Sequence, residues 1–354
     1  MENQEQGHKR RVRYTGTHPR AYQEKYKELH PEQYAQEVAH IIQSGKTPAG
    51  MHIPICVREI LDILQIRPGQ TGLDATLGYG GHTLELLRCL DGRGHLYATD
   101  VDPIESEKTR DRLAALGYGP ELLTIRQMNF SELDRVAPGQ TFDFVLADLG
   151  VSSMQIDNPQ RGFSFKSEGP LDLRLNPTAG VTAAERLREL TAEELASLLA
   201  ENADEPHAEE IARAAARTLR RGGRIDTTGQ LARVIGDALS AFPADERAEE
   251  IKKSCQRTFQ ALRIDVNGEF EALYEFLEKL PRVLSPGGRA AILTFHSGED
   301  RLVKQAFRHF LQAGLYRDIA DDVIRPSAEE CRQNPRARSA KLRWAVRTEQ
   351  ETAI

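Results

Sequence analysis

A glycine-rich turn is the part of the sequence best suited to hold a ligand. It follows a short apolar segment at residues 71–75, contains Gly78, Gly80 and Gly81, and opens a segment with helical spacing. Glycines let a backbone turn sharply and approach a ligand closely. Asp100 ends the next apolar segment, where a carboxylate can accept hydrogen bonds from both hydroxyls of a ribose. The pattern predicts a nucleotide pocket.

Two classes of ligand use such a pocket. A dinucleotide site has a third glycine where this sequence has Thr83. S-adenosylmethionine sites commonly have an acidic residue before the glycines, as Asp74 is here, and a carboxylate suits the ammonium group of that ligand. We therefore favour S-adenosylmethionine over a nicotinamide dinucleotide. Phe130, after a third apolar segment, is either an adenine-stacking ring or an ordinary core residue.

Asp148 is the candidate catalytic residue. It ends a fourth apolar segment, and the carboxyl ends of parallel strands form the ligand crevice of an open α/β sheet. Methyl transfer depends mostly on alignment and on charge placement. If the acceptor is an exocyclic amine, Asp148 or a nearby carbonyl can accept its N–H and help remove the proton. Alternatively, Asp148 caps a turn or holds the amine of the cofactor.

The segment after Asp148 mixes arginines with aromatic residues and lacks helical or strand periodicity. Such a loop can clamp an unstacked base by stacking and hydrogen bonding, and the alternative is a solvated linker. The candidate substrate-binding residues are Arg161, Phe163, Phe165 and Arg174, together with His296 at the end of a later strand. A lone histidine is more often structural. We find no His, Asp or Glu cluster with metal-ligand spacing, and the four cysteines form no CxxC pair.

Alternating elements position these residues. Strands are expected at residues 71–75, 95–100, 122–127, 142–147 and 289–295, with helices at 57–64, 82–90, 104–116 and around 302–310. This alternation predicts parallel βαβ units and an α/β fold.

Between residues 157 and 255 the alternation stops, and successive helices follow an irregular stretch. We predict a sheet domain made of residues 51–156 and 256–354, with a helical domain inserted between its two parts. Residues 1–50 form a basic extension with a possible helix at residues 31–43, either a surface arm or a contact with RNA or another partner. A capping box is expected where Thr191 precedes Glu194.

Composition limits the partners. The 354 residues are 40% hydrophobic and 28% charged, and 47 Lys and Arg against 53 Asp and Glu give a net charge of −6. This excludes a globally cationic nucleic-acid coat and leaves local basic clusters, one at residues 217–224 and one at residues 332–347. No apolar run approaches the ~20 residues that span a bilayer, and no signal peptide is apparent, so we expect a cytoplasmic protein.

Seven motifs together resemble one family. They are GYGGHT at residues 78–83, DLGVSS at 148–153, RGFSF at 161–165, PLDLR at 170–174, RTFQALR at 257–263, FHSGEDR at 295–301 and NPRARSA at 334–340. Over residues 52–347 the chain resembles the MraW/RsmH family, the 16S ribosomal RNA cytosine-N4 methyltransferases.

The resemblance implies a Rossmann-like class I methyltransferase sheet with an inserted helical RNA-recognition domain. It implies methylation of the exocyclic amine of a decoding-centre cytosine by S-adenosylmethionine, with the small ribosomal subunit as partner and no membrane contact. The implied cofactor contacts are Gly80, Gly81, His82, Asp100, Phe130, Asp148 and Gln155. An NAD-dependent oxidoreductase and a non-catalytic ribosome assembly factor are the alternatives.

The sequence also departs from the family pattern. Gly298 stands where a leucine is usual, Leu173 and Leu175 replace methionines, and Asn176 replaces an aspartate. Residues 1–50 have no counterpart in the shorter members. The chain therefore resembles a divergent second-copy branch.

Overall fold

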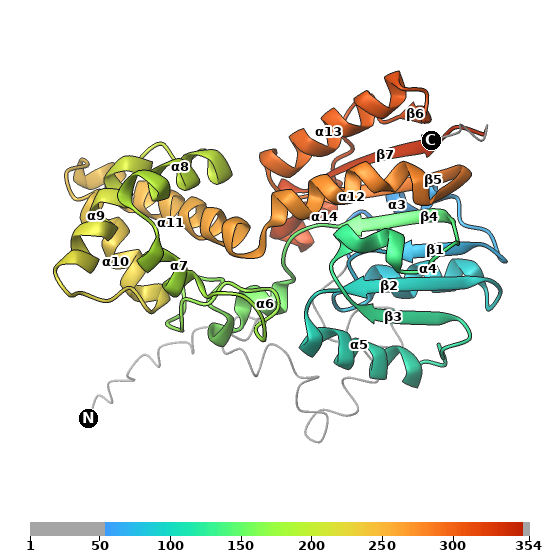
Figure 1. Ribbon diagram of the computed structural model, residues 1–354, viewed down its shortest axis with the longest axis horizontal. Helices are drawn as coiled ribbons and strands as arrows, with labels where there is room; N and C mark the ends of the chain where they lie inside the picture. The colour runs from blue at the N-terminus through green and yellow to red at the C-terminus, as the bar shows by residue number, and fades with distance from the viewer. Residues whose placement is uncertain (1–53, 350–354) are drawn as a thin grey trace, which may run out of the picture.

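The computed structural model describes residues 54–349. Two regions lie side by side along the longest axis of the molecule (Figure 1): a sheet flanked by helices, and a separate group of helices. The extension predicted at residues 1–50 and its helix lie outside the described residues.

The sheet has seven strands in the order β3-β2-β1-β4-β5-β7-β6. The five that pair in parallel are β1 (Thr71–Asp74), β2 (His95–Asp100), β3 (Leu123–Gln127), β4 (Phe142–Asp148) and β5 (Leu284–Thr294). Strand β7 (Lys341–Arg347) is antiparallel to both β5 and β6 (Tyr316–Ile319). This order is that of Rossmann-like class I methyltransferases and confirms the predicted fold class. Strands β6 and β7 were not predicted.

Helices cover both faces of the sheet. They are α3 (Val57–Leu64), α4 (Gly81–Leu90), α5 (Pro103–Ala115), α12 (Glu269–Val283), α13 (Ser297–Gln312) and the short α14 (Ala328–Gln333). The apolar run of β4 explains the two layers, because Phe142 and Val145 point into the core beneath α12 and α13, and Phe144 and Leu146 into the opposite core. A strand buried on both faces needs a nearly continuous apolar sequence.

The second region consists of α7 (Ala183–Glu189), α8 (Ala192–Ala203), α9 (Ala208–Arg220), α10 (Thr228–Ala238) and α11 (Ala244–Asn267). These helices bury a core of their own, made largely of leucine and alanine. Capping boxes begin α7, α8 and α10, and the one at Thr191 was predicted.

Helix α11 joins the two regions. The boundary predicted between residues 255 and 256 falls within this helix, whose buried residues Phe259 and Leu262 still belong to the helical core. The chain turns at Gly268, with φ +57°, and α12 then packs on the sheet core. No helix among residues 54–349 is long and apolar enough to cross a membrane.

Candidate active site

A pocket of about 660 Å³ opens at the carboxyl ends of the parallel strands β1, β2 and β4. Its walls include the glycine turn after β1, Asp100 at the end of β2, and Asp148 at the end of β4. This is the edge at which parallel α/β sheets bind ligands.

The glycine turn is shaped by packing as well as by the pocket. Gly81 lines the pocket and Gly80 does not. A Cβ on Gly80 would lie 2.9 Å from the Thr109 side chain on α5, and the φ of Gly80 is +64°. Gly80 therefore lets the turn pack closely against α5, which holds Gly81 at the pocket wall.

Asp100 is fixed by two backbone amides. Its Oδ2 accepts a hydrogen bond from the Gly78 N–H at 2.7 Å, and its Oδ1 accepts one from the Asp102 N–H at 2.9 Å. Burial raises the pKa of Asp100 to about 6, although both amide donors oppose the shift. The carboxylate lines the pocket with lone pairs still able to accept ligand hydroxyls.

Asp74 has a structural position that the sequence reasoning did not foresee. It is buried and does not line the pocket. Its Oδ2 accepts a hydrogen bond from the Thr83 hydroxyl at 2.6 Å, and its Oδ1 accepts one from the Thr76 N–H at 3.1 Å. Thr83, which stands in place of a third glycine, thus ties the start of α4 to the end of β1.

Asp148 pairs with His82 within the pocket. His82 Nδ1 lies 3.3 Å from Asp148 Oδ2, and His82 Nε2 lies 3.0 Å from the Ile55 carbonyl oxygen. Because a carbonyl can only accept, Nε2 carries a proton. Burial alone would lower the pKa of His82, but the neighbouring Asp148 carboxylate outweighs it and the pKa is raised. The two side chains therefore form a partly buried carboxylate–imidazole pair.

The other oxygen of Asp148 has no partner among the described residues. This atom, Asp148 Oδ1, is buried. The Asp148 N–H donates to the Thr76 hydroxyl at 2.7 Å, which fixes the backbone from which the carboxylate projects. A buried acceptor left without a donor costs free energy unless a ligand supplies one. The Asp148 side chain as a whole is 29% exposed and lines the pocket, so its carboxylate can accept an N–H from a bound molecule.

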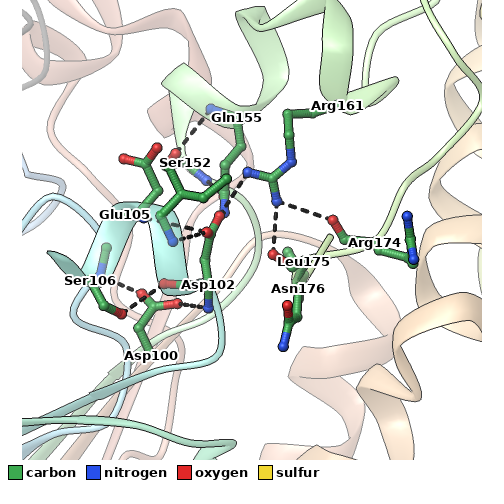
Figure 2. Close-up of polar contacts among 12 residues, drawn as sticks. Asp100, Asp102, Glu105, Ser106, Ser152, Gln155, Arg161, Arg174, Leu175 and Asn176 are labelled. Carbon is green, nitrogen blue, oxygen red and sulfur yellow. Dashed lines mark hydrogen bonds and ion pairs between the residues drawn. The ribbon is translucent and has the colours of Figure 1, made fainter. Parts of the chain in front are cut away.

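Gln155 and Arg161 belong to one buried network that is joined by Asp102 (Figure 2). Gln155 lines the pocket, and its Nε2 donates to Asp102 Oδ2 at 2.9 Å. Arg161 does not line the pocket; its Nη1 donates to the same Asp102 oxygen at 2.8 Å. The structure places Arg161 inside the protein rather than against a substrate.

The remaining predicted substrate contacts are spread out. Phe163 and Phe165 pack against the helical core, and Arg174 pairs with Asp172 through two nitrogens; none of the three lines the pocket. His296, at the start of α13, does line it. Phe130, expected on the cofactor side, also lines the pocket, with its ring edge-on to Phe276 at a centroid distance of 5.4 Å.

Three pocket residues on α11 were not predicted. Gln256, Gln260 and Arg263 line the side of the pocket that faces the helical region. Their spacing of i, i+4 and i+7 puts them on one face of a helix, while Phe259 and Leu262 are buried in the helical core. A polar stripe on an otherwise amphipathic helix was the signal that could have found them.

Acidic and histidine side chains also gather beside His296. Ligand atoms of Glu269, His296 and Glu299 lie within 4.8 Å of one another. The carboxylates already have partners, since Glu269 accepts two hydrogen bonds from Arg263 and Glu299 accepts one from the Phe295 N–H. We assign no metal to this group.

The two basic clusters differ in their contacts. In the C-terminal one, Arg343 is buried and pairs with Asp300, and Arg336 pairs with Asp157. In the other, Arg217, Arg220 and Arg221 are exposed and form no ion pair with any residue in the described range 54–349. Exposed arginines without an ion pair among the described residues therefore lie at the end of α9, and Arg338 of the C-terminal cluster is another, next to the pocket-lining Arg336.

The pocket fits the methyl donor expected for this fold. A glycine turn and the carboxylates of Asp100 and Asp148 meet in one cavity. Sheet order and site together define a Rossmann-like methyltransferase.

Comparison with known proteins agrees. The sequence pattern of the MraW methylase family matches residues 49–348, and the chain belongs to this family of S-adenosylmethionine-dependent methyltransferases. The resemblance seen in the sequence is confirmed, and the oxidoreductase alternative is set aside.

The similarity to named relatives extends beyond residues 49–348. Ribosomal RNA small subunit methyltransferase H 1 of Lachnoclostridium phytofermentans is 64% identical over 347 residues, covering 98% of this chain and 95% of the relative. Methyltransferase H 2 of Alkaliphilus metalliredigens is 64% identical over 348 residues, covering 98% of this chain and 100% of the relative. These alignments must reach into residues 1–50. Methyltransferase H of Koribacter versatilis, without a copy number, is 41% identical and covers 84% of this chain and 94% of its own. The numbered names confirm the resemblance to a branch that includes a second copy.

Proposed function

We propose that this protein transfers a methyl group from S-adenosylmethionine to the exocyclic N4 amine of a decoding-centre cytosine in 16S ribosomal RNA. One observation carries the proposal: the Asp148 carboxylate lines the pocket beside the glycine turn, and its Oδ1 has no donor among the described residues. The 64% identical relatives are named as methyltransferases of small-subunit ribosomal RNA, which supports the choice of RNA.

The pocket residues provide contacts for the methyl donor. Asp100 would accept the ribose hydroxyls, Phe130 would contact the adenine, and Gly81 lets the backbone approach the ligand. Gln155 and His82 complete this wall. When bound, S-adenosylmethionine supplies an electrophilic methyl group on a sulfonium centre.

Asp148 would act on the acceptor amine. The lone pair of a cytosine amine is delocalised into the ring, so the amine is a weak nucleophile. A hydrogen bond from its N–H to the Asp148 carboxylate favours the pyramidal nitrogen that can form the new bond to carbon. As that bond forms, the bond from the methyl carbon to the sulfonium sulfur breaks and a neutral thioether leaves. Asp148 takes the proton that the amine must lose. His82, whose Nδ1 lies 3.3 Å from Asp148 Oδ2, orients the carboxylate.

Ribosomal RNA would approach from the helical side. Gln256, Gln260 and Arg263 offer hydrogen bonds to a base entering the pocket, and the exposed arginines at the end of α9 can neutralise phosphates. We therefore infer that the helical region around residues 157–255 recognises RNA. Since small ribosomal subunits are the inferred partner, we expect the protein to act in the cytoplasm.

The test is methylation of small subunits taken from cells that lack this protein. Purified protein and isotopically labelled S-adenosylmethionine are added, and the RNA is digested for nucleoside mass spectrometry. We expect labelled N4-methylcytidine that maps to one nucleotide. A label on another nucleoside contradicts the proposed target. No label on subunits or on naked 16S RNA, from protein that binds the donor, favours a non-catalytic assembly factor.

A further inference from the structure

Arg161 and Asp102 form a buried ion pair between segments that are 59 residues apart in sequence. Their side chains are 8% and 0% exposed, respectively. Two charges taken out of water persist only where geometry and additional hydrogen bonds satisfy both partners. The contacts of this pair therefore show what it holds together.

Asp102 connects the pair to the donor side of the pocket. Its N–H donates to Asp100 Oδ1 at 2.9 Å, and its Oδ2 accepts from Gln155 Nε2 at 2.9 Å. Its Oδ1 also accepts from the Ile104 N–H at 3.0 Å and so caps α5. Both Asp100 and Gln155 line the pocket, whereas Asp102 does not.

Arg161 connects the pair to the opposite side. Its Nη2 donates to the carbonyl oxygens of Arg174 at 3.1 Å and of Leu175 at 2.7 Å (Figure 2). Leu175 lines the pocket. Leu173 is fully buried with φ +64°, a conformation that a leucine keeps only where its surroundings hold it. The Leu173 N–H donates to the Arg161 carbonyl oxygen at 3.2 Å.

We propose that Arg161 is a positioning residue that fixes segment 173–175 relative to Asp100 and Gln155 through its ion pair with Asp102. The inference rests on the proposed function, in which Asp100 and Gln155 hold the donor. A planar guanidinium suits this task because one nitrogen pairs with the carboxylate while another reaches the two carbonyls. Arg161 thus affects methyl transfer without contacting either substrate.

The test compares Arg161→Lys with Arg343→Lys. Lysine keeps the positive charge near Asp102, but its three donors share one nitrogen, which cannot occupy the positions of both Nη1 and Nη2. Arg343 is a matched control, because it is a buried arginine 2.7 Å from Asp300 and does not line the pocket. We expect Arg161→Lys to weaken donor binding and to lower kcat, each by about 10-fold. Arg343→Lys should change either quantity by less than about 2-fold at a similar loss of thermal stability.

Asp102→Asn separates positioning from general damage. If the two residues act as one unit, Asp102→Asn alone weakens donor binding to a similar extent. The double variant with Arg161→Lys then loses no more donor affinity than the weaker-binding single variant does. Independent residues would instead give a loss of affinity equal to the product of the two single losses. Multiplicative losses would overturn the proposal, as would equal effects of Arg161→Lys and Arg343→Lys.

Hydrogen exchange on the unaltered protein gives a second measurement if the variants fold poorly. Saturating S-adenosylmethionine should slow exchange of the Leu173 and Arg174 amides, which lie outside the pocket lining. Unchanged exchange at both amides contradicts the inference. Unaltered protein that binds no donor overturns the proposed function together with this inference, whereas normal donor binding by Arg161→Lys overturns the inference alone.

Discussion

The sheet region and the helical region bury different kinds of side chain. The helical region packs leucine and alanine, with few buried polar groups beyond Glu205, Thr228, Ser254 and Thr258. The sheet region buries acids, a histidine and threonines close to its ligand edge, among them Asp74, His82, Thr99 and Asp102. Burying a polar group costs free energy unless its hydrogen bonds are satisfied. A concentration of such groups therefore indicates a functional site. The helical region contributes one polar face of α11 to the pocket.

This contrast predicts that the largest functional loss comes from the sheet edge. Asp148→Asn keeps the size of the side chain but removes its charge and its ability to take a proton. We expect kcat for methyl transfer to fall by about 10²-fold or more, the range usual for loss of a general base. Single-turnover assays on small subunits measure the rate, and calorimetry measures donor affinity. A rate within about 3-fold of the unaltered protein would show that another group, such as a carbonyl, accepts the amine proton.

A core substitution in the helical region should affect stability without affecting donor binding. Leu199 is fully buried in the helical core, and Leu199→Ala should lower the free energy of unfolding by about 2–5 kcal/mol. Leu280→Ala, at a fully buried position in α12 beneath the sheet, is the matched control. Denaturant unfolding gives the stability of both variants. If folded Leu199→Ala binds the donor much more weakly than folded Leu280→Ala, the two regions are not separable in this way.

The fold could be predicted furthest where apolar segments are regular. The first four strands and their helices fall within one or two residues of the expected positions, because periodicity and turn residues agree there. Strand β7 was missed since its three basic residues resembled a surface run, although Arg343 is buried against Asp300. Strand β6 has only four residues, two of them exposed and charged.

The site was predictable in part for a similar reason. Residues at strand ends, such as Asp100 and Asp148, can be placed by topology alone, and both line the pocket. Arg161 could not be placed, because its partner Asp102 lies 59 residues away and only the folded chain brings them together. An exposed arginine and a buried one look alike in a sequence.

The pH dependence of donor binding tests the environment of Asp100 in the sheet region. Its pKa of about 6 lies above the ordinary value of 3.8, and hydroxyl donors of a ligand favour the ionised form. Donor affinity should therefore be constant above about pH 6 and fall by up to about 10-fold for each pH unit below it. Calorimetry with S-adenosylmethionine measures this profile, and Asp100→Asn should bind weakly with a flat one.

The raised pKa of Asp100 affects folding stability in the opposite direction from donor binding as the pH changes. A raised native pKa means that the folded protein holds this proton more tightly than the unfolded chain does. The contribution of Asp100 to stability is therefore present below about pH 4 and is lost as the pH rises through about 6. The difference in thermal stability between unaltered protein and Asp100→Asn isolates this contribution. A difference that grows with acidity in favour of Asp100→Asn would contradict the burial of a charged Asp100.

The smallest expected effects come from two threonines with the same chemistry in different regions. Thr227 begins α10, where its hydroxyl accepts from the Gln230 N–H at 3.2 Å, and Thr76 accepts from the Asp148 N–H at 2.7 Å. Each change to valine keeps the side-chain shape and removes the hydroxyl, at a cost of about 1 kcal/mol in stability. Thr76→Val also loses a longer hydrogen bond, 3.4 Å, from its hydroxyl to Asp74 Oδ1. Only Thr76→Val should also slow methyl transfer, because it frees the backbone that aims Asp148. Equal activities of the two variants, measured at matched stability, would mean that the Asp148 backbone is held without Thr76.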